Sequence, residues 1–476
     1  MPMRKLFFAS LLMVVALTAS AQERKEVHIL SANDMHAAIE CFPRLGFIAD
    51  SLRTLYPDLL VLSAGDNRSG DPLNDMYEIP AYPMVALMNI TGFHTTTLGN
   101  HEFDSGEKGL ATLIAMSDFT YLCANAHPAE STGIQIRPWQ KFDAGGTTVG
   151  IIGVVGMGPM GKPESHPDNM LDITFTDPLE TIQQYQFLRQ ECDVVVLLSH
   201  LGYEDDVKIS ASLPWVDLIV GGHSHTQLKG GEMHNGILIT QNVNRLKRVT
   251  HITLTLEDGK IVGKTAENIE VKGMKNENKV IQPLVEYFSN NPAFDRVLAT
   301  ADTPFSSFEE LGCLMTDAFV AESGADVSFQ NAGGVRYDTH DAGPITVKDV
   351  LRLDPFQNEV MMVEVTGKEL VDMLSKCYDN DQKLFPYVGG MTAEYAVDPA
   401  TKELKKVQLF DKNGKKLNLK KTYKVATNSY ALAVSPTDRK DQGHSIRRLT
   451  ADLIMSYLEQ QGHVSYQGRL CMKEIK

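Results

Sequence analysis

From Val27 to about Glu270, short apolar runs alternate with helix-like segments. Between the runs, Leu45, Ile48 and Ala49 fall on one helical face, and Asp177-Pro178 supplies the side-chain cap and first-turn proline of a further helix. Strands that alternate with helices form a sheet covered by helices, so we expect a layered α/β domain. The predicted strands are Val27–Leu30, Leu59–Ser63, Thr95–Leu98, Val149–Val155, Val194–Ser199, Leu218–Val220 and Ile237–Thr240.

The chain of 476 residues exceeds what one hydrophobic core usually organises, which favours two domains. A helix-like stretch ends near Asn290-Asn291-Pro292, and hydrophobic patterning restarts at Val297. We therefore expect a first domain over residues 26–275, a linker helix over 276–296 and a second domain over 297–476. The second domain is predicted to contain strands at Asp326–Gln330 and Val360–Val365 and a helix at Lys368–Cys377.

The first 21 residues have the three parts of a secretory signal peptide: Arg4 and Lys5, an apolar run from Leu6 to Leu17, and small residues that end at Ala21. The apolar run is short for a membrane span, and no later stretch approaches the ~20 apolar residues that a spanning helix needs. We expect cleavage near Ala21 and a mature chain that is periplasmic or secreted. An uncleaved N-terminal anchor is the alternative.

The net charge of −15 disfavours a nucleic-acid polymer as partner, because such polymers bind basic surfaces. The six cysteines are widely spaced, with no Cys-x-x-Cys pair of the kind that marks a zinc ribbon or a redox motif. Export permits disulfides without requiring them, so the sequence leaves the pairing of the cysteines open.

Metal-competent side chains follow nearly every predicted strand of the first domain. Layered α/β folds bind ligands beyond the carboxyl ends of their strands, so these side chains are expected to converge at one edge. Two carboxylates, one amide and several imidazoles form an oxygen and nitrogen ligand set that suits zinc, manganese, iron or cobalt. The candidates are Asp34, His36, Asp66, Asn100, His101, His200, His223 and His225.

Asp66 is the expected bridge between two ions, because a carboxylate has two oxygens and the preceding Gly65 lets the backbone approach closely. The other histidines have no motif around them. For these we expect a helix cap or a solvated loop; they are His28, His94, His127, His166, His234 and His251.

Five blocks of this sequence, in order, resemble the secreted 5'-nucleotidases, a family within the calcineurin-like phosphoesterases that includes UDP-sugar hydrolases and 2',3'-cyclic-nucleotide phosphodiesterases. The blocks are Ile29–His36, Leu62–Asp66, Leu98–Asp104, Leu198–Gly202 and Gly221–Thr226. The resemblance implies a layered β-sandwich metallophosphoesterase domain flanked by helices. It also implies a second α/β domain that recognises the substrate.

The same resemblance implies two divalent metal ions, zinc or manganese, with cobalt or iron as alternatives. One ion would be held by Asp34, His36, Asp66 and His225, and the second by Asp66, Asn100, His200 and His223. His101 would face the phosphate, where it would stabilise charge and assist the leaving oxygen, and Asp104 would hold the imidazole ring.

The second half of the chain also resembles its family counterpart. The segment from Asn331 to Arg336 resembles a glycine-rich substrate loop, in which the backbone at Gly333 and Gly334 suits an anion and Arg336 grips phosphate. Phe356 lies in a segment that resembles the family's Pro-Phe-x-Asn, where the phenylalanine stacks on the base. The plain alternatives are a tight turn for the glycines and a core position for Phe356.

One family feature is absent as such, namely a Gly-Gly-Asp-Gly-aromatic loop that supplies the second face of the base site. This chain has Thr427-Asn428-Ser429-Tyr430 there, followed by Ser435-Pro436-Thr437-Asp438-Arg439. This departure affects the expected identity of the substrate more than the expected reaction at the metal site.

The residues and the resemblance together indicate a metal-dependent phosphoesterase that hydrolyses 5'-nucleotides, with a small-molecule partner and no transmembrane segment in the mature chain. One alternative is a UDP-sugar hydrolase or 2',3'-cyclic-nucleotide phosphodiesterase with the same metal cluster. Another is an exported binding protein with a vestigial site.

Overall fold

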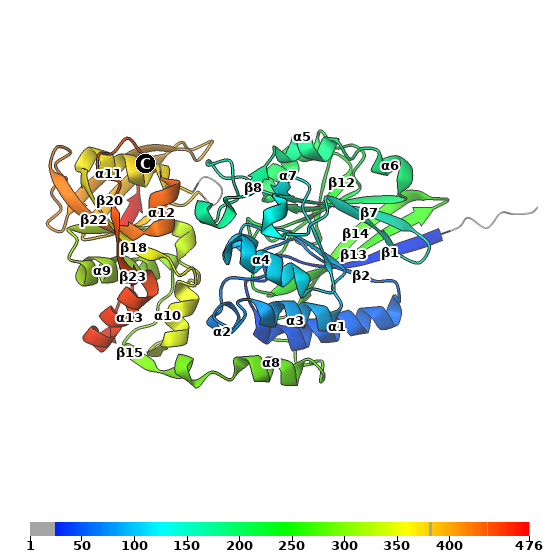
Figure 1. The fold of residues 1–476 in the computed structure, drawn as a ribbon, viewed down its shortest axis with the longest axis horizontal. Helices are drawn as coiled ribbons and strands as arrows, with labels where there is room; N and C mark the ends of the chain where they lie inside the picture. Colours follow the sequence, from blue (N-terminus) through cyan, green and yellow to red (C-terminus); the bar gives the residue numbers. More distant parts are fainter. Residues whose placement is uncertain (1–23, 380–382, 436, 476) are drawn as a thin grey trace, which may run out of the picture.

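The computed structural model describes residues 24–379, 383–435 and 437–475. The expected signal peptide over residues 1–21 lies outside these ranges. Figure 1 shows two bodies side by side, an N-terminal one in blue to green and a C-terminal one in yellow to red. Helix α8 (Gln282–Ser289) lies in the stretch of chain that connects them.

Two six-stranded sheets form the N-terminal body. The first has the order β14 (Lys260–Glu270), β13 (Arg248–Glu257), β1 (Arg24–Ala32), β2 (Leu60–Ser63), β3 (Thr95–Thr97) and β4 (Thr120–Leu122). The second has the order β11 (Glu232–His234), β12 (Ile237–Thr240), β10 (Leu218–Gly221), β9 (Val194–His200), β7 (Thr148–Val155) and β6 (Trp139–Asp143). A small two-stranded sheet pairs β5 (Ala126–Pro128) with β8 (Ile173–Phe175).

Alternate residues of the central strands point into different cores, as the two-residue period of a strand requires. In β1, Ile29 belongs to the core between the two sheets, whereas Leu30 packs against helices on the outer side. In β9, Val196 faces the other sheet and Leu197 faces the helices that cover its own sheet. Both faces of the central strands β2, β7, β9 and β10 are buried, which explains why these strands are nearly continuous apolar runs, whereas the outer strands β13 and β14 are partly exposed and carry polar residues.

Helices cover the outer faces of this sandwich (Figure 1). The helices α1 (Phe42–Leu55), α3 (Tyr82–Thr91) and α4 (Gly106–Ala115) pack on the first sheet, and α5 (Pro178–Gln183), α6 (Leu188–Glu191) and α7 (Tyr203–Ser210) pack on the second. Helix α5 begins as the sequence predicts, because Asp177 accepts a hydrogen bond from the Glu180 amide at 2.9 Å and Pro178 is the first helical residue.

The C-terminal body has one core around a five-stranded sheet of order β19 (Tyr387–Gly389), β16 (Val327–Gln330), β22 (Thr422–Asn428), β18 (Glu359–Thr366) and β23 (His444–Leu449). Two three-stranded sheets adjoin it, β17 (Gly343–Thr346)–β15 (Val297–Ala301)–β24 (His463–Val464) and β21 (Leu404–Asp411)–β20 (Met391–Val397)–β25 (Met472–Glu474). Its helices are α9 (Phe308–Ser323), α10 (Val347–Leu353), α11 (Gly367–Lys376), α12 (Ser429–Val434) and α13 (Thr450–Gln461).

The α/β fold class expected from the sequence is confirmed, as a β-sandwich flanked by helices joined to a second α/β unit. Over residues 24–379, 383–435 and 437–475, no helix has the length and apolar character needed to cross a membrane. All six cysteines are buried as free thiols.

Candidate active site

The predicted metal ligands of the first domain follow parallel strands of both sheets. In the first sheet, β1, β2 and β3 are parallel neighbours, and in the second sheet β9 and β10 are parallel neighbours. Their carboxyl ends therefore meet at one edge of the sandwich, which places the following side chains together. Asp34 and His36 follow β1, Asp66 follows β2, Asn100 and His101 follow β3, His200 ends β9, and His223 and His225 follow β10.

The backbone is strained at this edge. Left-handed φ angles, which non-glycine residues rarely adopt, occur at 48° for Asp34, 51° for Asp66 and 77° for His223. His36 and His225 share this conformation, with φ angles of 42° and 53°. Such conformations cost about 1–2 kcal/mol each and cluster at functional sites. The strained residues therefore lower the stability of the fold, and in return their side chains point toward one another at this edge.

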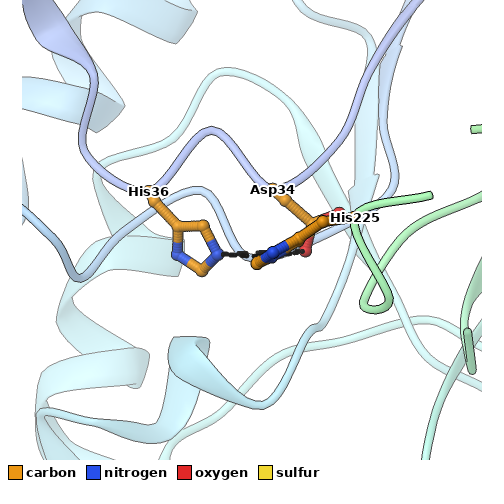
Figure 2. Close-up of side chains that lie close together, drawn as sticks. All are labelled: Asp34, His36 and His225. Atoms are coloured by element: carbon orange, nitrogen blue, oxygen red, sulfur yellow. Dashed lines mark hydrogen bonds and ion pairs between the residues drawn. The ribbon is translucent and has the colours of Figure 1, made fainter. Parts of the chain in front are cut away.

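Asp34, His36 and His225 form the first ligand group (Figure 2). The Nε2 atom of His225 lies 3.4 Å from Asp34 Oδ1 and 3.0 Å from His36 Nε2. The Nδ1 atom of His36 lies 3.1 Å from the Ser69 carbonyl oxygen, to which it donates, so the Nε2 lone pair faces the group. Asn33 donates to Asp34 at 2.7 Å and orients that carboxylate.

Asp66, His200 and His223 form the second group, and Asn100 joins them because its Oδ1 lies 3.1 Å from His223 Nδ1. The Nδ1 atom of His200 donates to the Ala64 carbonyl at 2.6 Å, which points Nε2 at Asp66 Oδ2, 3.2 Å away. That Nε2 is fully buried and has no hydrogen-bond partner in the described chain. A buried imidazole nitrogen that faces a carboxylate oxygen is an arrangement that a divalent cation can complete in place of a proton.

Asp66 lies between the two groups. Its Oδ2 is 3.2 Å from His200 Nε2 and 3.9 Å from both His36 Nε2 and His101 Nε2. Burial opposes its charge, but the imidazoles of His200 and His101 outweigh burial and hold the pKa of Asp66 well below its usual value. The carboxylate therefore stays ionised and has an oxygen within reach of either group.

His101 and Asp104 form a hydrogen-bonded pair beside the two groups. The Nδ1 atom of His101 lies 2.8 Å from Asp104 Oδ2, and Asp104 also accepts from Ser69 at 2.5 Å and from Ser165 at 2.9 Å. Burial lowers the pKa of His101, but the carboxylates of Asp104 and Asp66 outweigh it and raise the pKa. The Nε2 atom also lies close enough to His36 and Asp66 to act as a ligand, so geometry alone permits either role.

A cavity of about 450 Å³ adjoins the metal-ligating groups and is lined by both bodies. Asn331, Gly333, Arg336 and Phe356 line it, as predicted residues of the second domain, together with Tyr430. Gly334 is buried outside this lining, where an added Cβ would collide with the Gln330 amide. Gly334 therefore serves the packing of the loop, and the predicted contact between its backbone and an anion stays a prediction.

Two side chains of the second domain reach the ligand groups directly. The Nη2 atom of Arg336 lies 3.2 Å from both ring nitrogens of His36. The Phe356 ring stacks on His101 with a centroid separation of 5.5 Å and an interplanar angle of 15°, and the Arg336 guanidinium lies 5.3 Å from its centroid. The residues predicted to recognise phosphate and base thus meet the ligand groups of the other domain.

Comparison with known families identifies both halves of the chain. Residues 27–227 match the calcineurin-like phosphoesterases, and residues 289–435 match the 5'-nucleotidase C-terminal domain, so the two matches together span more than half of the chain. The chain belongs to the 5'-nucleotidase family of calcineurin-like phosphoesterases. The resemblance expected from the sequence is confirmed, and the protein is a metal-dependent phosphoester hydrolase.

Individual relatives agree with this assignment. Protein UshA of Yersinia enterocolitica is 26% identical over 431 residues, covering 78% of this phosphoesterase and 77% of that protein. A 5'-nucleotidase of Vibrio cholerae is 27% identical over 470 residues, covering 84% and 82%. The solved structure of a 5'-nucleotidase precursor from Thermus thermophilus has a TM-score of 0.82 at 23% identity, over 95% of this chain and 100% of that chain, and it confirms the fold.

Several residues that support the phosphoesterase site were not predicted. The Glu102 carboxylate accepts backbone hydrogen bonds from Asp66 and Asn67 at 2.9 Å each and from Gly99 at 2.7 Å, which ties the loops after β2 and β3 together. Its place between His101 and Asp104 was a signal that could have found it. Ser165, on the loop after β7, carries no comparable signal, because its partner Asp104 is distant in sequence.

Proposed function

We propose that this phosphoesterase hydrolyses 5'-nucleotides to nucleosides and phosphate outside the cytoplasm, with two divalent cations at the strand-end cluster. One observation carries the proposal. A single cavity brings the two ligand groups of the first domain together with Arg336 and Phe356 of the second. A phosphate ester that carries a planar base has the groups that such a cavity would contact.

The donor set fits two cations that share Asp66. Asp34, His36 and His225 would hold one, and Asn100, His200 and His223 the other. When bound, such cations polarise phosphoryl oxygens and lower the pKa of water. Imidazole and carboxylate donors without thiolates favour zinc or manganese, with cobalt or iron as alternatives.

Proton donation, phosphate binding and base stacking would be performed by side chains that do not hold a cation. His101 would donate a proton from Nε2 to the leaving oxygen, and Asp104 keeps the ring oriented through Nδ1. Arg336 would hold the phosphate oxygens, since a guanidinium binds two oxygens in parallel. Phe356 would stack on the base, and its ring now lies on His101, so the base would have to displace that contact or use the other face.

A second cavity favours an additional candidate function. It measures about 390 Å³ and is lined by Asn100, His200 and His223, so it reaches the second ligand group by another route. A monoester has one organic substituent, whereas a sugar nucleotide or a phosphodiester has groups on both sides of the reacting phosphorus. This cavity could hold the second substituent, which favours UDP-sugar hydrolysis by the same cluster; a 2',3'-cyclic nucleotide carries both ester oxygens on one ribose and would not need it.

The test begins with the secreted protein, stripped by a chelator and reloaded with zinc, manganese, cobalt or iron in turn. Each form is assayed on 5'-AMP, 5'-UMP, UDP-glucose, 2',3'-cyclic AMP and p-nitrophenyl phosphate. We expect chelation to abolish turnover and reloading to restore it, with the 5'-nucleotides turned over best. Activity on p-nitrophenyl phosphate without activity on any nucleotide would refute the substrate, and inactivity in every metal form would favour an exported binding protein.

The proposed export has its own test. We expect N-terminal sequencing of the secreted protein to begin at about Gln22, after cleavage of the signal peptide. A membrane-bound protein that retains Met1 would instead show that the segment is an anchor.

A further inference from the structure

Two of the cysteines of the second domain lie together, outside the lining of the main cavity. Cys313 lies on α9, and Cys471 directly precedes β25 near the end of the chain. A side-chain hydrogen bond joins their thiols, and the two residues are only 1% and 6% exposed. The other four cysteines, all in the described part of the chain, have no such contact with a cysteine.

The position of Cys471 is fixed by neighbouring strands and by α9. Its carbonyl oxygen accepts from the Ala393 amide of β20 at 3.0 Å, and its Sγ accepts from the Val388 amide of β19 at 3.5 Å. On the helix side, Cys313 Sγ lies 3.9 Å from the carbonyl oxygen of Arg469. The chain on both sides of the thiol pair is therefore held in place by ordinary backbone contacts.

Further contacts join the same two segments. Glu310, Cys313 and Asp317 are three and four residues apart, so they share one face of α9. The Glu310 carboxylate accepts from the Gly468 amide at 2.6 Å, and the Asp317 carboxylate lies 2.7 Å from the Arg469 guanidinium. The C-terminal segment thus runs along this face of α9, with the thiol pair between the two charged contacts.

We propose that Cys313 and Cys471 form a disulfide bond once the protein is outside the cytoplasm. This inference rests on the proposed export, because extracytoplasmic compartments are oxidising. Each thiol loses a proton, the two sulfur atoms become bonded, and the two electrons reduce the disulfide of an acceptor to two thiols. Oxidised glutathione or a thiol–disulfide oxidoreductase belongs to the chemical class of acceptor that this step requires.

The hydrogen bond between the thiols favours Cys471 as the attacking group. This hydrogen bond, and then burial, raise the pKa of Cys313, whereas the same hydrogen bond lowers the pKa of Cys471 against the opposing effect of burial. The thiolate is the nucleophile in disulfide exchange. Cys471 would therefore attack the acceptor before its segment docks on α9, forming a mixed disulfide, and Cys313 would then displace the acceptor from Cys471.

The bond would close a loop that contains most of the second domain. A crosslink restricts the unfolded chain, and the effect grows with the length of the closed loop. The last strand, β25, would also stay attached to the domain by a covalent bond in addition to its pairing with β20. We therefore expect reduction to destabilise the second domain.

The test begins with protein secreted through its own signal peptide, then denatured and treated with N-ethylmaleimide before peptide mapping without reductant. We expect the peptides of Cys313 and Cys471 to be linked and the other four cysteines to be alkylated. Reductant should lower the Tm of the wild type by about 5–15 °C, and should leave the Tm of Cys313→Ala and Cys471→Ala unchanged. Cys192→Ala, which changes a buried cysteine of the first domain, is the matched control and should retain the full shift.

Six alkylated cysteines in the secreted protein, or a link between any other pair, would overturn the proposal. The mapping of the wild type decides this even if an alanine variant does not fold. Protein produced in the cytoplasm and refolded in reduced and oxidised glutathione tests the pair without export. A link between Cys313 and Cys471 there supports the proposal, and six alkylated cysteines overturn it, whereas a failure of export appears separately as a retained Met1.

Discussion

At the scale of single residues, the charge on Asp66 connects the two ligand groups. Its Oδ2 faces His200 and His36, while its Oδ1 accepts a hydrogen bond from the His101 amide at 2.9 Å. Asparagine has nearly the same shape and can keep that backbone bond through its amide oxygen. An Asp66→Asn change therefore removes the charge with little change in packing.

We predict that Asp66→Asn lowers kcat at least about 100-fold, because losing a shared carboxylate removes several kcal/mol of metal-dependent stabilisation. Thermal unfolding and metal analysis of the same preparation accompany the kinetics. The expected result is a folded protein with less than the full metal content of the wild type. Full metal content together with near-wild-type turnover would exclude a shared carboxylate at this position.

The His101→Ala variant distinguishes a His101 that donates a proton to the leaving group from a His101 that binds a metal ion. As a proton donor, His101 matters more for a nucleoside than for p-nitrophenol, because the latter leaves without a proton. We expect kcat for 5'-AMP to fall about 10²–10⁴-fold, a smaller fall for p-nitrophenyl phosphate, and unchanged metal content. Metal loss with equal falls on both substrates would place His101 among the ligands.

At the scale of elements, the C-terminus of helix α10 carries a buried carboxyl group whose ionised form is disfavoured. Asp354 is the C-cap residue and is 2% exposed, and neither oxygen has a hydrogen-bond partner of good geometry among the described residues. Burial raises its pKa from 3.8 to about 6, against smaller opposing effects of the Thr450 side chain and the Phe356 backbone. The helix dipole adds to the disadvantage of a negative charge there.

The raised pKa of Asp354 has a defined consequence for stability. The folded state binds a proton that the unfolded state has released between about pH 4 and pH 6, so the free energy of unfolding falls as pH rises through this window. Asparagine does not titrate. We predict that Asp354→Asn matches the wild type near pH 4 and exceeds it by up to about 3 kcal/mol at pH 8, measured by denaturant unfolding. A difference that is independent of pH would show that Asp354 is not the titrating group.

Elements also explain which parts of the site the sequence could predict. The ligands at the ends of β1, β2, β3, β9 and β10 were predictable, because a strand brings its own end to the edge where parallel neighbours end. The contact of Ser165 with Asp104 and that of Asn358 with Tyr430 depend on how loops distant in sequence pack, and no local pattern encodes them. The close approach of Gly334 to the Gln330 amide is likewise a contact that the motif alone did not predict.

At the scale of the whole molecule, one ion pair joins helices of the two bodies. Arg352, in the last turn of α10, donates from Nε to Asp71 Oδ2 at 2.6 Å. Asp71 is fully buried and caps the short helix α2 (Pro72–Asp75) by accepting from the Leu73 amide at 3.0 Å. The pair therefore links the placement of the second domain to a loop that begins just after Asp66.

A double-mutant cycle measures this link. Asp71→Asn keeps the helix cap and loses the charge, and Arg352→Gln loses the other charge. We predict a coupling of about 1–3 kcal/mol in unfolding and a roughly tenfold rise in KM for 5'-AMP in either single variant, with the double variant no worse than the singles. Strictly additive effects would show that the two side chains act independently.

The contacts of Arg336 with His36 and of Phe356 with His101 have a consequence for substrate affinity. A divalent cation would use the same His36 nitrogen that the guanidinium contacts, and a base stacked on Phe356 would either displace His101 or use the other face of the ring. These contacts of the second domain would compete with the cation and with one of the two positions of the base. If the contacts exist in roughly nine tenths of free molecules, the apparent dissociation constant is about tenfold higher than the intrinsic one. Side chains that recognise the substrate would then also set the nucleotide concentration above which the enzyme responds.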